Sequence, residues 1–344
     1  SFKAKTFTKL LATVNQLSNF IIAETTASVS SASITDIQTV SISSGANGTT
    51  ITDSALSSTI VSGTNVGYSA LDGAPVNLVA NTEFTSKTAA ITLNDYVNER
   101  ADPLGVACYP YLADAASITD FASSLQIDGP SYMSMYNLWV STSDEDGGYV
   151  WNPGIGTVIG AGMIRVPNLN RDLIFTPPAG IESAFRDLVD ISPNTLSQKV
   201  IDSYVQQDGA NVAVFKQGKG FFLFSSRTQA TNPLYHSIHI RRQSSFYKTA
   251  LEDNLLFAVQ KPNDIGLHKD IYAAIISFFK GEYNNGGLER SIPFETACEV
   301  INDKTVNPSS QDRKIHNVAI NWIPTENTES LVIRVNRNDG VLIA

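Results

Sequence analysis

A glycine-rich stretch near the middle of the chain is the first candidate for chemistry. It reads Gly154-Ile155-Gly156-Thr157-Val158-Ile159-Gly160-Ala161-Gly162, a Gly-x-Gly-x-x-x-Gly spacing. A dinucleotide-binding loop needs its glycines directly after a strand, at a helix start, with an acidic residue about 20 residues further on. The next acid, Asp172, lies in a proline-bounded loop instead. We therefore expect the glycines to pack a helix closely on a sheet, with a nucleotide-binding α/β enzyme using residues 154–162 as the alternative.

The histidines do not form a metal site in the sequence pattern. His236 and His239 fall in a segment, residues 236–242, that reads as a strand. Three residues apart on a strand, their side chains point to opposite faces and cannot share a metal ion. His268 and His316 are isolated, with no cysteine or carboxylate at ligand spacing. The sequence therefore predicts no metal ligand among them.

Acidic and sulfur side chains add no catalytic pattern. The run Asp144-Glu145-Asp146 lacks the ligand alternation of a calcium loop and indicates a solvated turn. Cys108 and Cys298 lie far apart in apolar segments, which favours buried free thiols of a reduced protein over a disulfide. No nucleophile elbow or phosphate loop occurs. The sequence thus predicts no catalytic residue, no cofactor and no metal, in a protein that is not an enzyme.

Charge is sparse and unevenly distributed. Charged residues make up 17% of the chain, against roughly 25% in typical domains, which indicates surface hidden in assemblies. Residues 1–164 hold 5 basic and 14 acidic side chains, and the remainder holds 19 of each. Arg241-Arg242 and Arg313-Lys314 are pairs rather than a basic patch, so we expect them to be solvated or salt-bridged and nucleic acid not to be a partner. No apolar run approaches the ~20 residues of a membrane span, so no membrane insertion is expected.

The first 66 residues differ in composition from the rest. Apolar side chains between Thr6 and Ile22 recur at the spacing of one helix face. Residues 25–64 are rich in Ser and Thr, with strand-like alternations such as Val40-Ser41-Ile42-Ser43. We expect a small β-rich segment here rather than a disordered linker. A β-rich adhesin is the alternative function that this segment suggests.

From residue 68 strands and helices alternate, which predicts a parallel sheet covered on both faces. A helix ending near Arg100 has Thr85-Ser86 as its N-cap. Another helix spans Ser117 to Leu125. The expected strands are 76–80, 104–109 and 133–140.

The last third contains parts in a recognisable order. They are a strand at 221–224, a second at 236–242, two amphipathic helices, a Gly286-Gly287 break, Cys298 in a strand-like context, and alternating strands at 317–322 and 331–335 joined across Pro324. The helix from Leu267 to Tyr283 has one apolar stripe. Its polar side carries His268, Lys269, Asp270, Ser277, Lys280 and Glu282.

This order resembles the C-terminal domain of contractile tail sheath proteins, the helical jackets of phage tails and related injection machines. Pro177-Pro178-Ala179-Gly180, shortly after Asp172, is similar to a loop of that family, and Ala70-Leu71-Asp72 before the 76–80 strand is similar to the start of its α/β core. The resemblance covers about residues 68–340. The Pro-Gly-Val start usual in the family does not occur, so we expect a divergent member or a fragment of a larger sheath protein.

The resemblance implies a mixed α/β fold in three parts. Residues 1–66 would form the N-terminal helix and β-rich segment, 67–215 a doubly covered, mostly parallel sheet core, and 216–344 an inner sheath-type α/β domain. It also implies a non-enzymatic structural subunit of a bacteriophage contractile tail, assembled in the host cytoplasm and located in the virion. Its partners would be itself, in a helical polymer of stacked hexameric rings, the tail tube protein and the baseplate.

The family also links its subunits by strands that add to a small sheet of a neighbour. Carried over to this chain, the resemblance implies that the terminal strands take part in this pairing, whereas a local hairpin across residues 324–327 is the alternative, and both can hold. Which strand is donor and which is acceptor is left open. The residues proposed for intersubunit strand pairing are Val318, Ile320, Trp322, Leu331, Ile333 and Val335. The polar side of the 267–283 helix would then offer contacts to the tube.

Overall fold

A computed structural model describes eight stretches of the chain. They are residues 52–56, 59–61, 64–143, 147–170, 174–186, 188–303, 306–308 and 314–326. All belong to a compact unit that begins at Thr52. The expected helix 6–22 and most of the Ser/Thr-rich segment lie outside the described residues.

The end of the Ser/Thr-rich segment contains an antiparallel strand pair. It consists of β1 (Thr59–Val61) and β2 (Thr64–Val66), between the 3-10 helices η1 (Asp53–Leu56) and η2 (Gly67–Leu71). The expected β character is confirmed for these residues. The three-part domain division stays a prediction.

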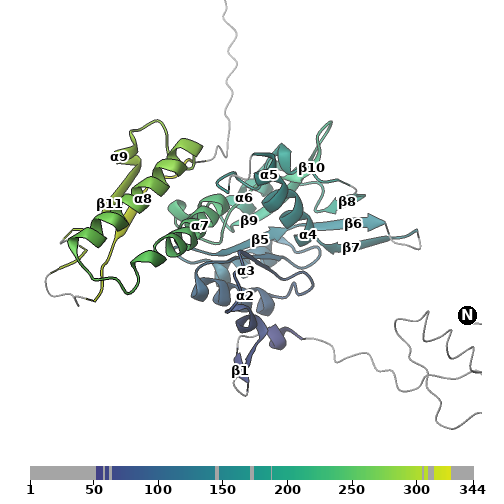
Figure 1. The fold of residues 1–344 in the computed structure, drawn as a ribbon. Coiled ribbons are helices and arrows are strands. Elements are labelled where there is room, and N and C mark those ends of the chain that lie inside the picture. The colour runs from purple at the N-terminus through teal and green to yellow at the C-terminus, as the bar shows by residue number, and fades with distance from the viewer. Residues whose placement is uncertain are drawn as a thin grey trace, which may run out of the picture. The chain divides into compact units, whose positions relative to one another are not determined.

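A five-stranded sheet forms the centre of the described chain (Figure 1). Its order is β10-β9-β5-β4-β3, in which β3, β4, β5 and β9 are parallel and β10 is antiparallel to β9. The strands are β3 (Leu78–Ala80), β4 (Leu104–Cys108), β5 (Met133–Asn137), β9 (Ala210–Lys216) and β10 (Gly220–Leu223). The predicted mostly parallel sheet is confirmed.

Three helices cover one face of this sheet. They are α2 (Lys87–Arg100), α3 (Ala115–Leu125) and α6 (Gln198–Gln206). The Ser86 hydroxyl accepts a hydrogen bond from the Ala89 amide at 3.1 Å, which confirms the expected N-cap of α2. Figure 1 shows α2 and α3 together on one side of β5. Their apolar stripes bury Leu93, Val97, Ile118, Phe121 and Leu125 against Ala107, Met133 and Met135.

The opposite face is also covered, as the parallel pairing requires. Side chains alternate along β4, so that Leu104, Val106 and Cys108 join a second core cluster. This cluster is closed by the start of α7 (Ile238–Asn254), by α4 (Ile155–Thr157) and by the π-helix η3 (Val158–Arg165). Helix α5 (Val166–Leu169) follows η3 directly.

One predicted strand, 133–140, is wrong as a single element. The chain leaves the central sheet after Asn137, and Leu138 separates β5 from β6 (Trp139–Ser143). The second strand lies in a separate antiparallel sheet of order β7-β6-β8, with β7 (Tyr149–Pro153) and β8 (Asp190–Ser192). Apolar side chains continue through the break because Leu138 is itself completely buried. The pattern therefore gave no sign of the change of sheet.

The prediction of a strand at 236–242 is also wrong, because this segment contains the first turn of a helix. The 3-10 helix η5 (Pro233–Tyr235) comes just before it, and α7 begins at Ile238. Another 3-10 helix, η4 (Ile181–Ser183), lies earlier in the chain. Its first turn is buried on all sides, because Ile238, His239 and Ile240 are at most 8% exposed. A helix segment without a solvent-facing side does not show the 3.6-residue period.

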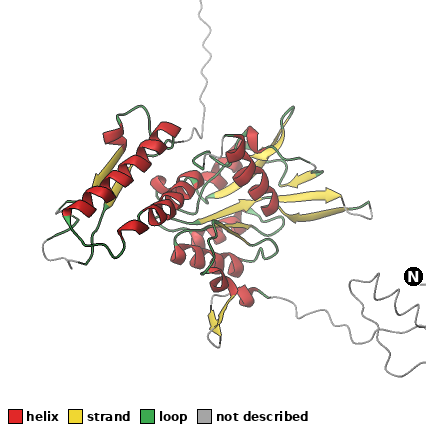
Figure 2. Cartoon of the chain, viewed as in Figure 1, coloured by secondary structure: helices red, strands yellow, loops and turns green. Residues whose placement is uncertain are grey.

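The C-terminal lobe, residues 255–326, follows α7. Its elements are η6 (Leu256–Ala258), α8 (Ile265–Asn285), α9 (Phe294–Ala297), β11 (Cys298–Ile301) and β12 (Ala319–Trp322). Figure 2 shows α8 beside the strand pair, and contacts between α8 and β11 join them. Ile238 of α7 belongs to the second core cluster, and Tyr247 of the same helix to the core of the lobe. This one helix therefore connects the central sheet to the lobe.

Candidate assembly surface

Helix α8 is the longest element of the C-terminal lobe and packs against its strand β11. The Asp264 carboxylate caps it by accepting a hydrogen bond from the Leu267 amide at 2.8 Å. Gly286 ends it with φ +92°, a left-handed conformation that favours glycine, as the Gly286-Gly287 break predicted. The expected apolar stripe is confirmed. Its buried members are Leu267, Ile271, Ile275 and Phe279.

The sheet of the lobe packs one face on this stripe. Strands β11 and β12 are antiparallel, with Cys298 opposite Trp322 and Ile301 opposite Ala319. Val318, Ile320 and Trp322 pack against the core of the lobe, so they share one face as the alternation predicted. The Trp322 ring lies edge-on to Tyr247, with ring centroids 5.1 Å apart.

The outer edge of β12 carries backbone groups without a strand partner among the described residues. The Ile323 amide donates to the Ala297 carbonyl at 2.9 Å. This bond shows that Ile323, and every second residue before it in β12, directs its backbone groups toward β11. By the alternation of such ladders, the N–H and C=O groups of Ile320 and Trp322 point away from β11. A strand from elsewhere can pair at this edge. Leu331, Ile333 and Val335, the other residues proposed for strand pairing, lie outside the described residues.

Polar side chains connect α7 to the end of α8. The Gln243 amide nitrogen donates to the Gly287 carbonyl at 2.8 Å, and the Tyr247 hydroxyl donates to the Glu282 carboxylate at 3.1 Å. Burial raises the pKa of the Glu282 carboxyl, and the bond from Tyr247 opposes that rise. Sequence reasoning missed this network because it joins residues about 40 positions apart. Only the i, i+4 spacing of Gln243 and Tyr247 was a local sign of it.

The polar side of α8 divides into exposed and engaged residues. Lys269, Asp270, Ser277 and Lys280 are exposed, whereas Glu282 is half-buried and bonded to Tyr247. His268 was expected to be isolated from His316, and this is wrong. The two imidazole rings stack with centroids 3.7 Å apart, beside a cavity of about 580 Å³. Desolvation, and to a smaller extent the neighbouring His268, lowers the pKa of His316.

Two glycines of the stretch, Gly154 and Gly162, pack closely, as predicted, whereas a Cβ on Gly156 or Gly160 would meet no atom within 4 Å. A Cβ on Gly154 would lie 2.5 Å from Leu138 Cγ, and one on Gly162 would lie 2.6 Å from Leu223 Cδ1 and 2.8 Å from the Pro178 carbonyl oxygen. The stretch follows β7 of the antiparallel sheet rather than a strand of the parallel one. This arrangement supports helix packing over a nucleotide site.

Both cysteines are free and buried, which confirms the expected thiols. Burial raises the pKa of Cys108 to about 12 and that of Cys298 to about 11, so neither is a reactive thiolate at neutral pH. His239 lies in the first turn of α7, and His236 lies just before that helix, at the end of η5, rather than on a strand. The described residues contain no group of three side chains placed to hold a metal ion. The acidic run 144–146 and Asp172 lie outside the described residues.

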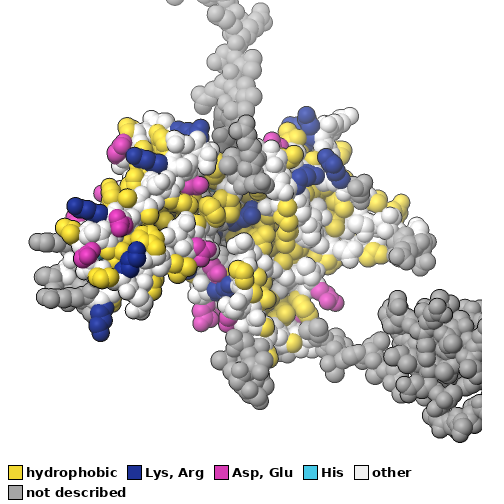
Figure 3. Space-filling model, in the orientation of Figure 1, with side chains coloured by type: hydrophobic (Ala, Val, Ile, Leu, Met, Phe, Trp, Pro, Cys, Tyr) yellow, Lys and Arg dark blue, Asp and Glu magenta, His cyan; other side chains and the backbone are white. Residues whose placement is uncertain are grey.

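The prediction that Arg241 is solvated or salt-bridged is wrong, whereas Arg242 stays partly exposed to solvent. Arg241 is buried, with its guanidinium 4.8 Å from the centroid of the Tyr132 ring. Arg242 donates to the Met163 carbonyl at 3.0 Å. Figure 3 shows basic, acidic and hydrophobic side chains intermingled on one face, without a large basic patch. Within the described part of the chain, every helix is too short or too polar to cross a bilayer.

Solved structures match this arrangement of elements. A chain of the anti-feeding prophage baseplate, a six-fold symmetrised cryo-EM structure, matches with a TM-score of 0.65 and 14% identity, covering 78% of this chain and 71% of that one. A chain of the PVC sheath complex, from an extracellular contractile injection system in the contracted state, matches with a TM-score of 0.64 and 16% identity over 77% and 71%. The chain has the contractile sheath fold. A chain of the anti-feeding prophage helical sheath in the contracted state agrees, with a TM-score of 0.64 and 15% identity over 78% and 72%.

The resemblance that the C-terminal order indicated is thereby confirmed for the fold. No family model and no curated protein match the sequence. At 14–16% identity the contractile sheath fold is retained although most side chains differ. Function therefore has to be argued from this chain's own surfaces.

Proposed function

We propose that this protein is a structural subunit of a contractile sheath, without enzymatic activity. The observation that supports this most is the shared fold over 77–78% of the chain with chains of two contracted sheaths. The polymer would be a helical cylinder of stacked hexameric rings around a tube, with the baseplate at one end. Its place would be the tail of a phage or phage-like particle, assembled in the host cytoplasm.

The edge of β12 that has no strand partner in the described part of the chain supplies a physical basis for assembly. A strand of one copy that pairs at this edge of the next makes a heterologous contact, and such contacts extend into helices when they do not close. Main-chain hydrogen bonds hold a lattice together while the rigid bodies rotate. The alternation of Leu331, Ile333 and Val335 in the sequence predicts the apolar face of a strand that would suit this pairing, on either the donor or the acceptor side.

Contraction needs two alternative packings of the same subunits and does not require nucleotide hydrolysis. Interfaces between rigid bodies are bistable, and many subunits moving to a better-packed state release energy together. The baseplate would trigger this change. The exposed side of α8, with Lys269 and Lys280, would face the tube, and the acidic first half would face outward. Contraction would then drive the tube through the host envelope.

Electron microscopy of the purified protein, at high concentration with and without a tail tube as template, tests this function. We expect hollow, cross-striated cylinders. Ile333→Lys places a charge on the proposed pairing face and should abolish them, and Val332→Lys, on the opposite face of the same strand, is the matched control. Discrete particles in the presence of the tube would contradict the sheath function. Cylinders unaffected by I333K would contradict the role of this strand.

A further inference from the structure

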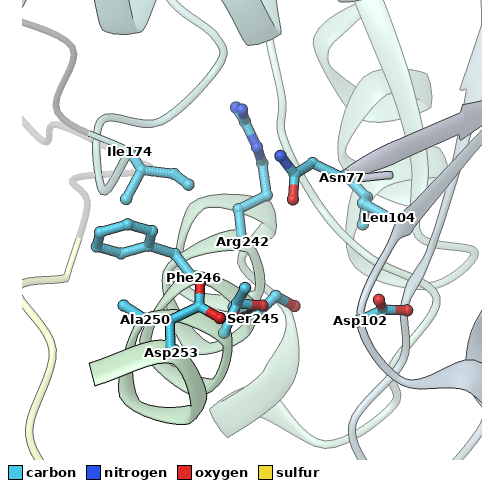
Figure 4. A pocket seen from close by; sticks show the side chains of 10 residues that line it. Asn77, Asp102, Leu104, Ile174, Arg242, Ser245, Phe246, Ala250 and Asp253 are labelled. Atoms are coloured by element: carbon cyan, nitrogen blue, oxygen red, sulfur yellow. Dashed lines mark hydrogen bonds between the residues drawn. The ribbon is translucent and has the colours of Figure 1, made fainter. Parts of the chain in front are cut away.

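A cavity of about 310 Å³ borders Arg242 of α7. Figure 4 shows Asp102 and Asp253 among the side chains that line it, so charges of both signs face it within one chain. Arg242 also donates to the Met163 carbonyl at 3.0 Å. The charged groups of this cavity therefore point to no further ligand.

A larger cavity, of about 580 Å³, lies at the start of α8. Its walls come from the first two turns of this helix, from the residues that follow β11, and from His316, which precedes β12. Ile301 of β11 lies opposite Ala319 of β12. The cavity therefore adjoins the end of the sheet at which β11 ends and β12 begins, and we call it the lobe pocket.

The lobe pocket exposes groups that a folded protein normally covers. Ile265 is 75% exposed and Tyr272 is 41% exposed, and both line the pocket. The Nε2 atom of His316 is buried and has no hydrogen-bond partner among the described residues. In the stacked ring of His268, by contrast, Nε2 donates to the Asn263 side-chain oxygen. Apolar walls beside one unpaired polar atom suit a peptide, which offers apolar side chains together with a backbone N–H or C=O.

The sequence after Glu326 contains an apolar segment that suits these walls. It reads Val341-Leu342-Ile343-Ala344 and follows the polar run Asn336-Arg337-Asn338-Asp339-Gly340. Residues 309–313, which connect two parts of the pocket wall, read Ser-Ser-Gln-Asp-Arg. These side chains are all polar and do not match the exposed Ile265 and Tyr272. The segment 341–344 is therefore the better occupant.

The path of the chain allows this segment to reach the pocket. The Thr325 hydroxyl donates to the Gly286 carbonyl at 2.9 Å, so the chain leaves β12 beside the end of α8. His268 and Gly286 are 18 residues apart on this helix, which is about 27 Å along its axis. Residues 327–340 span up to about 46 Å when extended. A strand at 331–335 that is antiparallel to β12 also runs back toward the pocket.

We propose that the lobe pocket binds the segment 341–344 of the same chain. Leu342 and Ile343 pack against Ile265 and Tyr272, and a backbone group of the segment bonds to His316 Nε2. The docked segment anchors residues 331–335 beside β12 on their own lobe. The same chain is favoured over a second copy, because a short tether makes the local concentration of the segment very high. The inference goes beyond the sheath function and does not depend on it.

Thiol cross-linking of the dilute protein tests the contact directly. Lys269→Cys at the pocket and Leu342→Cys in the segment should join within one chain on addition of a short bismaleimide, because both native thiols are buried. Ser277→Cys with Leu342→Cys is the matched control and should not join. Ser277 is exposed and lies about 12 Å further along α8.

Two results of this experiment would overturn the inference. Cross-linking between two chains would show that a second copy supplies the segment. Cross-linking that is absent, or that is equal for the pocket position and for Ser277, would exclude docking at the lobe pocket.

An NMR titration of His316 tests the chemistry of the pocket. Desolvation lowers the pKa of His316, and a docked segment adds to that desolvation. Leu342→Asn, which leaves the charge of the chain unchanged, should therefore raise the pKa of His316 toward 6.5. Asn338→Gln, a polar change outside the segment, should not move it. The same shift in both variants, or no shift in L342N, would contradict the proposal.

Failure of this inference differs from failure of the sheath function. Intrachain cross-linking through K269C in a protein that never forms cylinders would contradict the sheath function and leave the docked segment standing. Cylinders formed by a protein in which the segment does not cross-link would support the sheath function and overturn the docking.

Discussion

The central sheet and the C-terminal lobe bury their strands in opposite ways. Every residue of β4 is buried, and helices cover both faces of its sheet. In the lobe, β12 has no fully buried residue, its sheet has two strands among the described residues, and α8 packs against the pair from one side. Parallel strands are stable only when both faces are covered, whereas an isolated strand pair is marginal in water.

This difference separates a rigid body from an attachment surface. Helices of the same chain cover both faces of the central sheet. The lobe depends on Tyr247 of α7 for its core and leaves one edge of β12 open among the described residues. A subunit that rotates within a lattice needs both kinds of region.

Phe279→Ala gives the largest expected effect and tests whether the lobe unfolds by itself. Phe279 is 1% exposed in the core of the lobe, and removing such a ring costs about 3–5 kcal/mol. Hydrogen exchange should accelerate in residues 265–326 while the amides of β4 and β5 keep their protection. Tyr272→Ala, at an exposed position of the same helix, should change little. Uniform acceleration in both regions would show that the two regions are one cooperative unit.

Gly154→Ala should destabilise the central body by about 1–3 kcal/mol, because its methyl group would overlap Leu138. Gly156→Ala is the matched control. No atom lies within 4 Å of its added Cβ, and alanine is favoured over glycine in a helix by about 0.5–1 kcal/mol. Urea unfolding measures both. Equal loss in the two variants would contradict close packing as the reason for Gly154.

Glu282→Gln tests the polar connection between α7 and α8. Burial raises the folded-state pKa of Glu282 above its usual 4.5, so the folded lobe binds this proton more tightly than the unfolded chain. Its contribution to stability is therefore present below about pH 4.5 and is lost as the pH rises through the raised value. E282Q should remove this decline and melt higher than wild type at pH 7. A lower melting temperature at pH 7 would show that the ionised carboxylate stabilises the lobe.

The smallest effect is expected at His316. Its pH dependence has the opposite sign to that of Glu282, because stability is lost at low pH rather than at high pH. Burial and the stacked His268 hold the pKa of His316 below 6.5. Its contribution is present above pH 6.5 and is lost as the pH falls through the lowered value. Acidification from pH 7 to 5 should lower the hydrogen-exchange protection factors, which compare each rate with the intrinsic rate at the same pH, in residues 314–318 of wild type but not of His316→Phe. An equal loss of protection in both proteins would exclude His316 as the titrating group.

Much of the architecture was predictable because it depends on neighbours in the sequence. Ser86 and Gly286 lie where α2 begins and α8 ends, since a cap bonds to amides or carbonyls within one turn. The period of the α8 stripe, the alternation of Val318, Ile320 and Trp322, and the close packing of Gly154 were predictable for the same reason. The order of these parts along the chain is enough to indicate the contractile sheath fold.

Only the tertiary structure decided the features that join distant segments. The change of sheet at Leu138 and the helical start of α7 were hidden because burial on every side removes the polar residues that mark a period. The stack of His268 on His316, the bond between Tyr247 and Glu282, and the cavity around Arg242 bring together residues 35 or more positions apart. The sequence by itself determined which segments are helices or strands wherever one face meets solvent. Which side chains meet was decided by packing, because a contact between distant segments leaves no local pattern in either of them.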